Sequence, residues 1–211
     1  MNAMKGRRKY MQDSIMTSIR HALSLRPKSI LSEDTLAPAG VMLLLYQKSG
    51  ECHLLLNKRS QHVEDHKGEI SFPGGRMDQG DHGLLETALR ETHEEMGVLP
   101  ADVDVLGELD EVATISKYKV SPFVGAVPES YNFRPNEMEV AEVIEAPLRE
   151  LVRGEAARDE VRIVRGEQVH LASYVFRGHV IWGATGRILQ SFLEVLDSVP
   201  EKEALWKSKR D

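Results

Sequence analysis

Residues 72–98 read FPGGRMDQGDHGLLETALRETHEEMGV, and this segment guides the interpretation of the whole chain. Its second half predicts a helix from Leu84 to Met96, because apolar side chains recur there at helical spacing and Gly97 is a typical stop signal. The predicted core-facing stripe of this helix consists of Leu85, Ala88, Leu89, Thr92 and Met96. We therefore expect the helix to pack this stripe against a sheet.

Three carboxylates lie on a different face of the same helix. At about 100° per residue, Glu91, Glu94 and Glu95 fall within an arc of roughly 100°, so they should point sideways along the edge of the sheet. A solvated acidic face, partly compensated by Arg90, is the simplest interpretation of such a charge run. Like charges at these spacings repel by roughly 0.2–0.5 kcal/mol per pair, so a shared ligand is the alternative.

The segment before the helix favours that alternative. The glycines of the turn at residues 72–75 allow a close approach of the backbone to a ligand, and Pro73 restricts the entry into the turn. Carboxylate and carbonyl oxygens suit Mg²⁺ or Mn²⁺, and the absence of a Cys/His cluster argues against structural zinc. The three glutamates and the carbonyl oxygen of Gly75 therefore predict a magnesium cradle, which binds best when phosphate oxygens complete the shell.

The rest of the chain alternates strand and helix patterns without regular βαβ spacing. Strands are predicted at residues 39–46, 52–56, 103–113, 119–127, 140–144, 161–164 and 170–176. Helices are predicted at residues 11–23, 84–96, 147–152 and 183–196, and residues 57–71 are expected to form a long functional loop. These elements predict one domain of the α/β (α+β) class, a sandwich of helices on a mixed sheet.

Composition excludes several classes of protein. The 211 residues are 41% hydrophobic and 28% charged, which is typical of a globular protein and not of global disorder. The longest apolar run, residues 41–46, is far shorter than a membrane span, so no membrane partner is expected. The net charge of −6 argues against a nucleic-acid partner. Cys52 is the single cysteine, and we expect an inert core thiol in a cytoplasmic protein.

Taken together, residues 75–98 resemble the Nudix box, G-x5-E-x7-R-E-U-x-E-E-x-G-U, in which U is bulky and apolar. The half from Arg90 to Val98 matches apart from Thr92 at an apolar position, and it includes the glutamates. The first acidic position departs from the pattern, since it is Asp81 and eight residues separate it from Arg90. The resemblance implies a Nudix-like α/β/α sandwich with a mixed sheet at residues 31–199, an N-terminal helical extension at 1–30 and a charged tail at 200–211.

A second signature upstream resembles the coenzyme A pyrophosphatase branch of the family, L-L-T-x-R-S-x3-R-x3-G-x3-F-P-G-G. Residues 55–60 read LLNKRS, and Gly68 and residues 72–75 keep the spacing. Asn57 replaces the threonine, and Glu64 replaces the second arginine. The resemblance implies cleavage of coenzyme A or a derivative to 4′-phosphopantetheine and adenosine 3′,5′-bisphosphate by a homodimeric enzyme. Glu64 favours the alternatives, which are ADP-ribose, a nucleotide sugar or a nucleoside triphosphate.

The resemblance also implies roles for single residues. Glu91 and Glu95, helped by Glu94, hold Mg²⁺ or Mn²⁺ against the diphosphate, and Arg90 fixes the rotamer of Glu91 or a neighbour. The general base is Glu91 or a carboxylate from a later loop, for which we select Glu139 over Glu137 and Glu142. The expected substrate-binding residues are Arg59, Lys58, Phe72 and Arg76. A Nudix-fold nucleotide-binding module without catalysis remains the alternative from another functional class.

Overall fold

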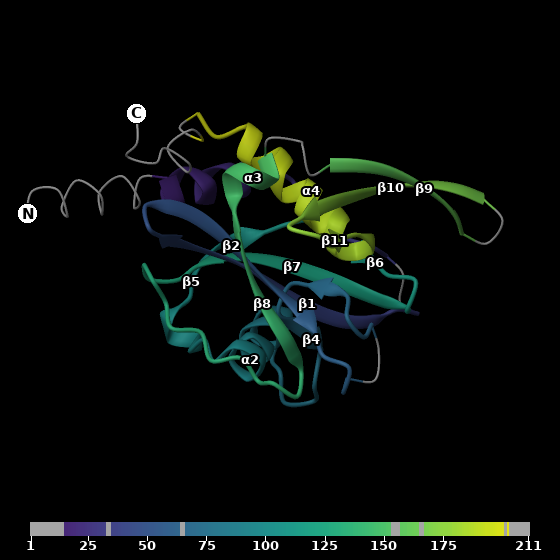
Figure 1. The fold of residues 1–211 in the computed structure, drawn as a ribbon, viewed down its shortest axis with the longest axis horizontal. Helices are drawn as coiled ribbons and strands as arrows, with labels where there is room; N and C mark the ends of the chain where they lie inside the picture. The colour runs from purple at the N-terminus through teal and green to yellow at the C-terminus, as the bar shows by residue number, and fades with distance from the viewer. Residues whose placement is uncertain are drawn as a thin grey trace, which may run out of the picture.

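A computed structural model describes residues 15–32, 35–63, 66–152, 157–164, 167–200 and 202. Within these ranges the chain forms one mixed sheet between two helical layers, with a smaller antiparallel sheet beside it (Figure 1). The position of Glu64, and residues 11–14 of the predicted first helix, lie outside the described ranges. The described part of that helix spans residues 15–25.

The large sheet has the core order β3-β2-β1-β7-β5. β1 runs parallel to β7 and antiparallel to β2 and β4, which makes the sheet mixed. The β4, β6 and β8 strands pair with β1, β7 and β2, respectively. The bounds are β1 Ala37–Lys48, β2 Glu51–Arg59, β3 Ile70–Ser71, β4 Gly74–Arg76, β5 Asp104–Glu108, β6 Val112–Ala113, β7 Tyr118–Ala126 and β8 Val140–Pro147.

Alternating residues of β1 supply both halves of the hydrophobic core. Met42 and Leu44 face α2 (Leu84–Met96), where they pack with Ala88 and Met96. Leu43 and Leu45 face the opposite layer, formed by the helix at residues 15–25 and by α4 (Gly183–Asp197). A strand that is buried on both faces reads as a continuous apolar run, as residues 41–46 do. The predicted α/β/α sandwich is confirmed.

The β1–β2 turn is tight, because Ser49 and Gly50 both have positive φ angles, of 54° and 87°. This conformation matches the right-handed twist of a two-residue hairpin. The sheet also brings α2 unusually close: a Cβ atom at Gly40 would lie 2.3 Å from the carbonyl oxygen of Leu84. Glycine at position 40 of β1 is therefore required for the first turn of α2 to pack on the sheet. This contact fixes the distance between the acidic helix and the sheet.

Several predicted boundaries are corrected by the structure. The segment 57–71 is not one loop, because β2 continues to Arg59 and β3 pairs with it opposite Asn57 and Lys58. The predicted strand 103–113 splits into β5 and β6. The sequence pattern also missed β4, the 3-10 helix η1 (Pro100–Asp102) and β11 (His179–Ile181). These three elements are only three residues long each, so no periodicity could mark them.

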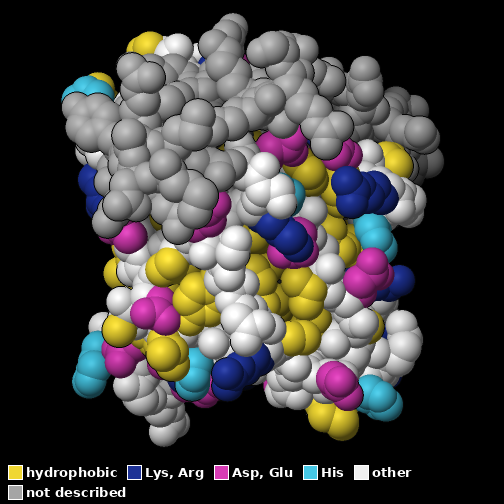
Figure 2. Space-filling model, turned by 60° about the vertical axis from the view of Figure 1, so that its left-hand side comes forward, with side chains coloured by type: hydrophobic (Ala, Val, Ile, Leu, Met, Phe, Trp, Pro, Cys, Tyr) yellow, Lys and Arg dark blue, Asp and Glu magenta, His cyan; other side chains and the backbone are white. Residues whose placement is uncertain are grey.

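The small sheet has the order β11-β10-β9, with β9 at Ala157–Val164 and β10 at Glu167–Phe176. Its long β9–β10 hairpin extends past the main body in Figure 1. The short helix α3 (Leu148–Val152) follows directly after Pro147, as the sequence predicted. In the described residues, no helix combines the length and apolarity needed to cross a bilayer. On the face in Figure 2, charged side chains of both signs are interspersed with hydrophobic ones.

Candidate active site

The glycine turn places α2 beside the sheet edge at β4. Gly74 has a φ angle of 152°, and a Cβ atom there would lie 2.4 Å from the carbonyl oxygen of Gly40. A Cβ atom at Gly75 would lie 2.5 Å from the Glu91 carboxylate, so that carboxylate rests directly on the turn. Only glycine fits at these two positions, as the close approach predicted for the turn requires.

Glu95 is the most buried of the three helix carboxylates, with 4% of the residue exposed. The side-chain amide of Asn57 donates a hydrogen bond to its Oε2 at 2.7 Å, and the backbone N–H of Gly74 donates another. The Arg59 guanidinium lies 3.9 Å from Oε1. Burial raises the pKa of Glu95 to about 8, against the lowering effect of Arg59, and the charges of Glu91 and Glu139 raise it further.

Glu91 and Glu139 complete a cluster of carboxylates with Glu95. Burial raises the pKa of Glu91, although Arg90 opposes this effect, and the charges of Glu94 and Glu139 add to the rise. Glu139 is half-buried and is held where β8 begins, since its carbonyl oxygen accepts a hydrogen bond from the Ser60 N–H at 2.8 Å. The backbone of Glu139 is thus held beside the end of β2, and its charge acts on both helix carboxylates.

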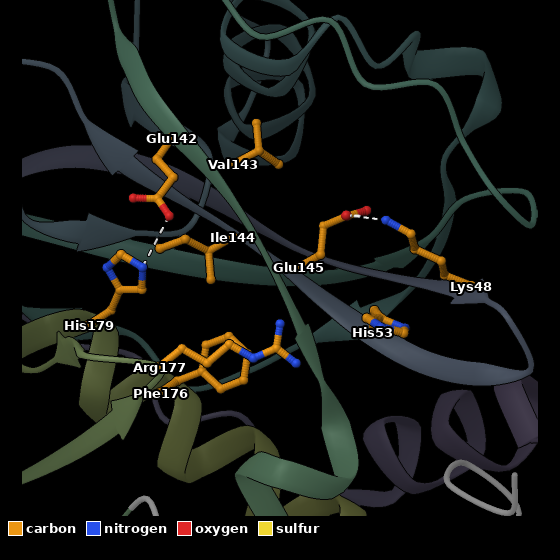
Figure 3. A pocket seen from close by; sticks show the side chains of 9 residues that line it. All are labelled: Lys48, His53, Glu142, Val143, Ile144, Glu145, Phe176, Arg177 and His179. Atoms are coloured by element: carbon orange, nitrogen blue, oxygen red, sulfur yellow. Dashed lines mark hydrogen bonds and ion pairs between the residues drawn. The ribbon is translucent and has the colours of Figure 1, made fainter.

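The competing acidic residues of this segment lie elsewhere. Glu137 is exposed, and Glu142 pairs with His179 at 3.2 Å. Glu142 belongs to a separate cavity of about 450 Å³ on β8, which also holds the Lys48–Glu145 pair (Figure 3). None of the residues lining that cavity is one of the clustered carboxylates. Of the three acidic residues, Glu139 is therefore the one whose charge is seen to act on Glu91 and Glu95.

Arg90 connects the acidic loop to the helix. Its guanidinium donates to both oxygens of Asp81 at 3.0 Å, to Glu91 at 2.9 Å and to Glu94 at 3.2 Å. It also donates to the backbone carbonyl of Arg76 at 3.2 Å. This pairing holds the pKa of Asp81 well below its usual range and raises that of Arg90. Sequence reasoning expected Arg90 to brace a glutamate but did not identify Asp81 as its main partner.

Four residues predicted for the site stand apart from the carboxylate cluster. Because side chains alternate along β2, Lys58 lies on the face opposite Asn57 and Arg59, toward the layer that contains α4. Phe72 is 3% exposed and packs in the core, and its predicted substrate contact stays a prediction. The Arg76 side chain is exposed, and it is its backbone carbonyl that contacts Arg90. Glu94 is also exposed, with Arg90 as its partner.

The donor set fits a hard divalent cation in its chemistry. The carboxylates of Glu91 and Glu95 supply hard oxygen donors that are partly or fully buried. A divalent cation would offset the repulsion between their negative charges. Among the described residues, no three carboxylate, imidazole or thiol groups already converge on one point. In this structure Arg90 holds both Glu91 and Glu94.

Comparison with known proteins places these features in a family. A model described as the NUDIX domain matches residues 36–170. The chain is 34% identical over 168 residues to "Uncharacterized Nudix hydrolase NudL" of Enterobacter sp. (strain 638), covering 79% of this chain and 86% of that protein. It is 41% identical over 140 residues to the protein of the same name from Yersinia enterocolitica, covering 65% and 70%.

The structural comparison agrees at the level of the fold. The MutT/nudix family protein from Enterococcus faecalis superposes with a TM-score of 0.51 at 13% identity, covering 95% of this chain and 77% of that protein. At this identity the likeness concerns the architecture alone.

Proposed function

The chain belongs to the Nudix family, and from that membership we propose that it is a divalent-metal-dependent hydrolase of nucleoside diphosphate derivatives, with coenzyme A or one of its derivatives as the substrate. The observation that carries the proposal is the cluster of Glu91, Glu95 and Glu139 beside the turn at Gly75. The charge of Glu139 disfavours the ionised forms of Glu91 and Glu95, and such an arrangement is otherwise unfavourable in a folded protein.

In this proposal the protein supplies position and charge. Glu91 and Glu95, assisted by Glu94 and the carbonyl oxygen of Gly75, hold Mg²⁺ or Mn²⁺. The cation's contribution is to offset the negative charge that develops on the diphosphate and to make a water molecule more acidic. Arg90 orients Glu91 through its 2.9 Å contact and is itself anchored by Asp81. This anchoring limits the freedom of the Glu91 side chain before substrate binds.

A carboxylate accepts the proton of the attacking water. Glu139 and Glu91 are the two candidates, because both lie in the cluster and neither forms part of the β2 contacts that hold Glu95. A base works best when its pKa lies near the working pH, and burial moves the pKa of Glu91 in that direction. We select Glu139 as the later-loop contributor and test it against Glu137 below.

The choice of coenzyme A rests on the signature at residues 55–60 and on the position of those residues in β2. Asn57 and Arg59 of the segment LLNKRS face Glu95, so the signature lies beside the carboxylates and not only before them in sequence. The Arg59 side chain is 25% exposed, which supports its proposed role in meeting a substrate phosphate. The proposal includes a homodimer in the cytoplasm, with the Nudix domain at residues 31–199.

A mass-spectrometric product assay tests the proposal. The protein is incubated with Mg²⁺ or Mn²⁺ and a panel of coenzyme A, ADP-ribose, a nucleotide sugar and a nucleoside triphosphate. We expect coenzyme A to be turned over fastest, with 4′-phosphopantetheine and adenosine 3′,5′-bisphosphate as products. Faster turnover of ADP-ribose would refute the substrate assignment. Tight nucleotide binding without hydrolysis in either metal would refute catalysis and favour a binding module.

A further inference from the structure

Asn57 and Ser71 form a directly opposed pair across strands β2 and β3. The Ser71 hydroxyl donates a hydrogen bond to Asn57 Oδ1 at 2.6 Å. Asn57 is only 1% exposed, so its side-chain amide must find its partners within the protein. The hydroxyl contact occupies the carbonyl side of the amide and thereby turns the NH₂ group the other way.

The NH₂ group of Asn57 points at the helix carboxylate. Its Nδ2 donates to Glu95 Oε2 at 2.7 Å, and both side chains are buried. Arg59, two residues along the same strand, lies 3.9 Å from the other oxygen, Oε1. The two carboxylate oxygens are thus distinguished: Oε2 is fixed by Asn57, and Oε1 lies on the side of Arg59.

A buried series of hydrogen-bonded hydroxyl, amide and carboxylate groups is costly unless every member is paired. Here each group has its partner, and the series ends on the Glu95 carboxylate, which is assigned to the cation. Groups that orient a metal-ligating side chain by hydrogen bonding to it affect the metal affinity strongly, although they do not contact the ion. Asn57 also stands where the resembled signature has threonine.

We propose that Asn57, oriented by Ser71, is a positioning residue that fixes the Glu95 carboxylate for binding of the divalent cation. The inference rests on the proposed function, because it takes Glu95 as a ligand. It adds a residue that binds neither substrate nor cation and acts only through Glu95. If that is so, the effect of changing Asn57 must disappear when Glu95 has already lost its charge.

The test measures the affinity for Mn²⁺ alone, by electron paramagnetic resonance of the free ion, in four proteins. These are the parent, Asn57→Leu, Glu95→Gln and the double variant. We expect Asn57→Leu to raise the Kd about 10-fold in the parent background and less than about twofold in the Glu95→Gln background. Ser71→Ala leaves Asn57 in place and should raise the Kd about threefold, which provides a second variant if Asn57→Leu fails to fold.

Tyr46→Phe is the matched control. Tyr46 is 1% exposed, and its hydroxyl donates to the Glu145 carboxylate at 2.7 Å, away from the carboxylate cluster. We expect this variant to lower the melting temperature without changing the Kd for Mn²⁺. An effect of Asn57→Leu or Ser71→Ala on melting alone, like that of the control, would overturn the inference. So would an equal effect of Asn57→Leu in the Glu95→Gln background.

Measurement of kcat and KM for coenzyme A separates this inference from the proposed function. If the parent hydrolyses no diphosphate but the Mn²⁺ results are as expected, the proposed function fails and the role of Asn57 stands. If the parent hydrolyses coenzyme A and the Asn57→Leu variant binds Mn²⁺ as the parent does, only the inference fails. We expect Asn57→Leu to lower kcat at limiting Mn²⁺ and to recover at saturating Mn²⁺, with KM for coenzyme A unchanged.

Discussion

Arg90 and Asp81 form a two-point ion pair, in which Nε and Nη2 of the guanidinium each lie 3.0 Å from a different oxygen of the carboxylate. Asp81 is one of two positions at which the chain departs from the family pattern, in this case by residue type and by one residue of spacing. The pair shows how the departure is accommodated: the shorter side chain, from a loop longer by one residue, still reaches the arginine. The Asp81 carboxylate also accepts a hydrogen bond from Thr87 at 2.9 Å, which ties the loop to the helix.

Removing the charge of Asp81 should release Arg90. We expect Asp81→Asn to lower kcat about 10-fold, because Arg90 would lose its anchor and hold Glu91 less firmly. Steady-state assays and thermal melts check this. The control is Asp78→Asn, since Asp78 faces the same guanidinium at 3.8 Å but is 71% exposed. Equal effects of the two substitutions would contradict a special role for Asp81.

The fit of Gly75 against Glu91 leads to a second prediction. A methyl group at position 75 would lie within 2.5 Å of the carboxylate and displace it. We expect Gly75→Ala to reduce turnover roughly 100-fold, since misplacing a catalytic group by about 1 Å has an effect of this size. Gly80→Ala is the control, because nothing lies within 4 Å of a Cβ atom there. Normal turnover of Gly75→Ala would show that Glu91 can function away from the turn.

Glu139 and Glu137 provide a paired test of the general base. We expect Glu139→Gln to lower kcat about 100-fold or more, as the loss of a proton acceptor does, and Glu137→Gln to leave kcat within about twofold. The difference follows from their positions, since Glu139 interacts with both helix carboxylates and Glu137 is exposed. Parental turnover in Glu139→Gln would leave Glu91 as the base.

The raised pKa of Glu95 makes the stability of the metal-free protein depend on pH. Between about 4.5 and about 8, the folded protein keeps a proton on Glu95 that the unfolded chain has lost. The unfolded state therefore binds fewer protons, and the free energy of unfolding falls as the pH rises through this window. Below the window the contribution of the protonated carboxyl is fully present.

Glu95→Gln removes this dependence. In the presence of a metal chelator, we compare the free energy of unfolding of the variant with that of the parent. We expect this difference to be more favourable to the variant at about pH 8.5 than at about pH 5, by about 1 kcal/mol or more. Urea unfolding at the two pH values measures the difference. Arg59 and the Gly74 N–H oppose the rise in the pKa, while Glu91 and Glu139 favour it. A stability difference that is the same at both pH values would show that Glu95 ionises normally.

The layers of the fold were predictable because the main elements carry strong local patterns. The helix Leu84–Met96 has the predicted bounds, since its apolar stripe is regular and Gly97 ends it with a φ angle of 68°. The apolar run in β1 likewise indicated a strand buried on both faces. The end of β2 was taken as a loop because Asn57 and Arg59 are polar. The contacts of both side chains with Glu95 on α2 explain why polar residues stand on this part of the strand.

The candidate site was predictable in composition but not in detail. The helical spacing placed Glu91, Glu94 and Glu95 on one arc, yet it gave no reason why Glu95 is buried and Glu94 exposed. That difference depends on the contact of Glu95 with Asn57 in β2. Asn57 lies 38 residues earlier in the sequence, too far for a local pattern to indicate the contact. Phe72 and Lys58 were assigned to the site from their place in a signature. In the structure Phe72 packs in the core and Lys58 lies on the face of β2 opposite Asn57, which their place in the signature did not indicate.

The most direct test is the crystal structure of the protein with Mn²⁺, recorded with anomalous scattering. If Glu91 and Glu95 are the ligands, an anomalous peak will lie roughly 2.1–2.2 Å from an oxygen of each, beside the carbonyl of Gly75, with Glu91 moved from Arg90. A structure at saturating Mn²⁺ without such a peak, in which Arg90 still holds Glu91 and Glu94 as it does now, would contradict the account.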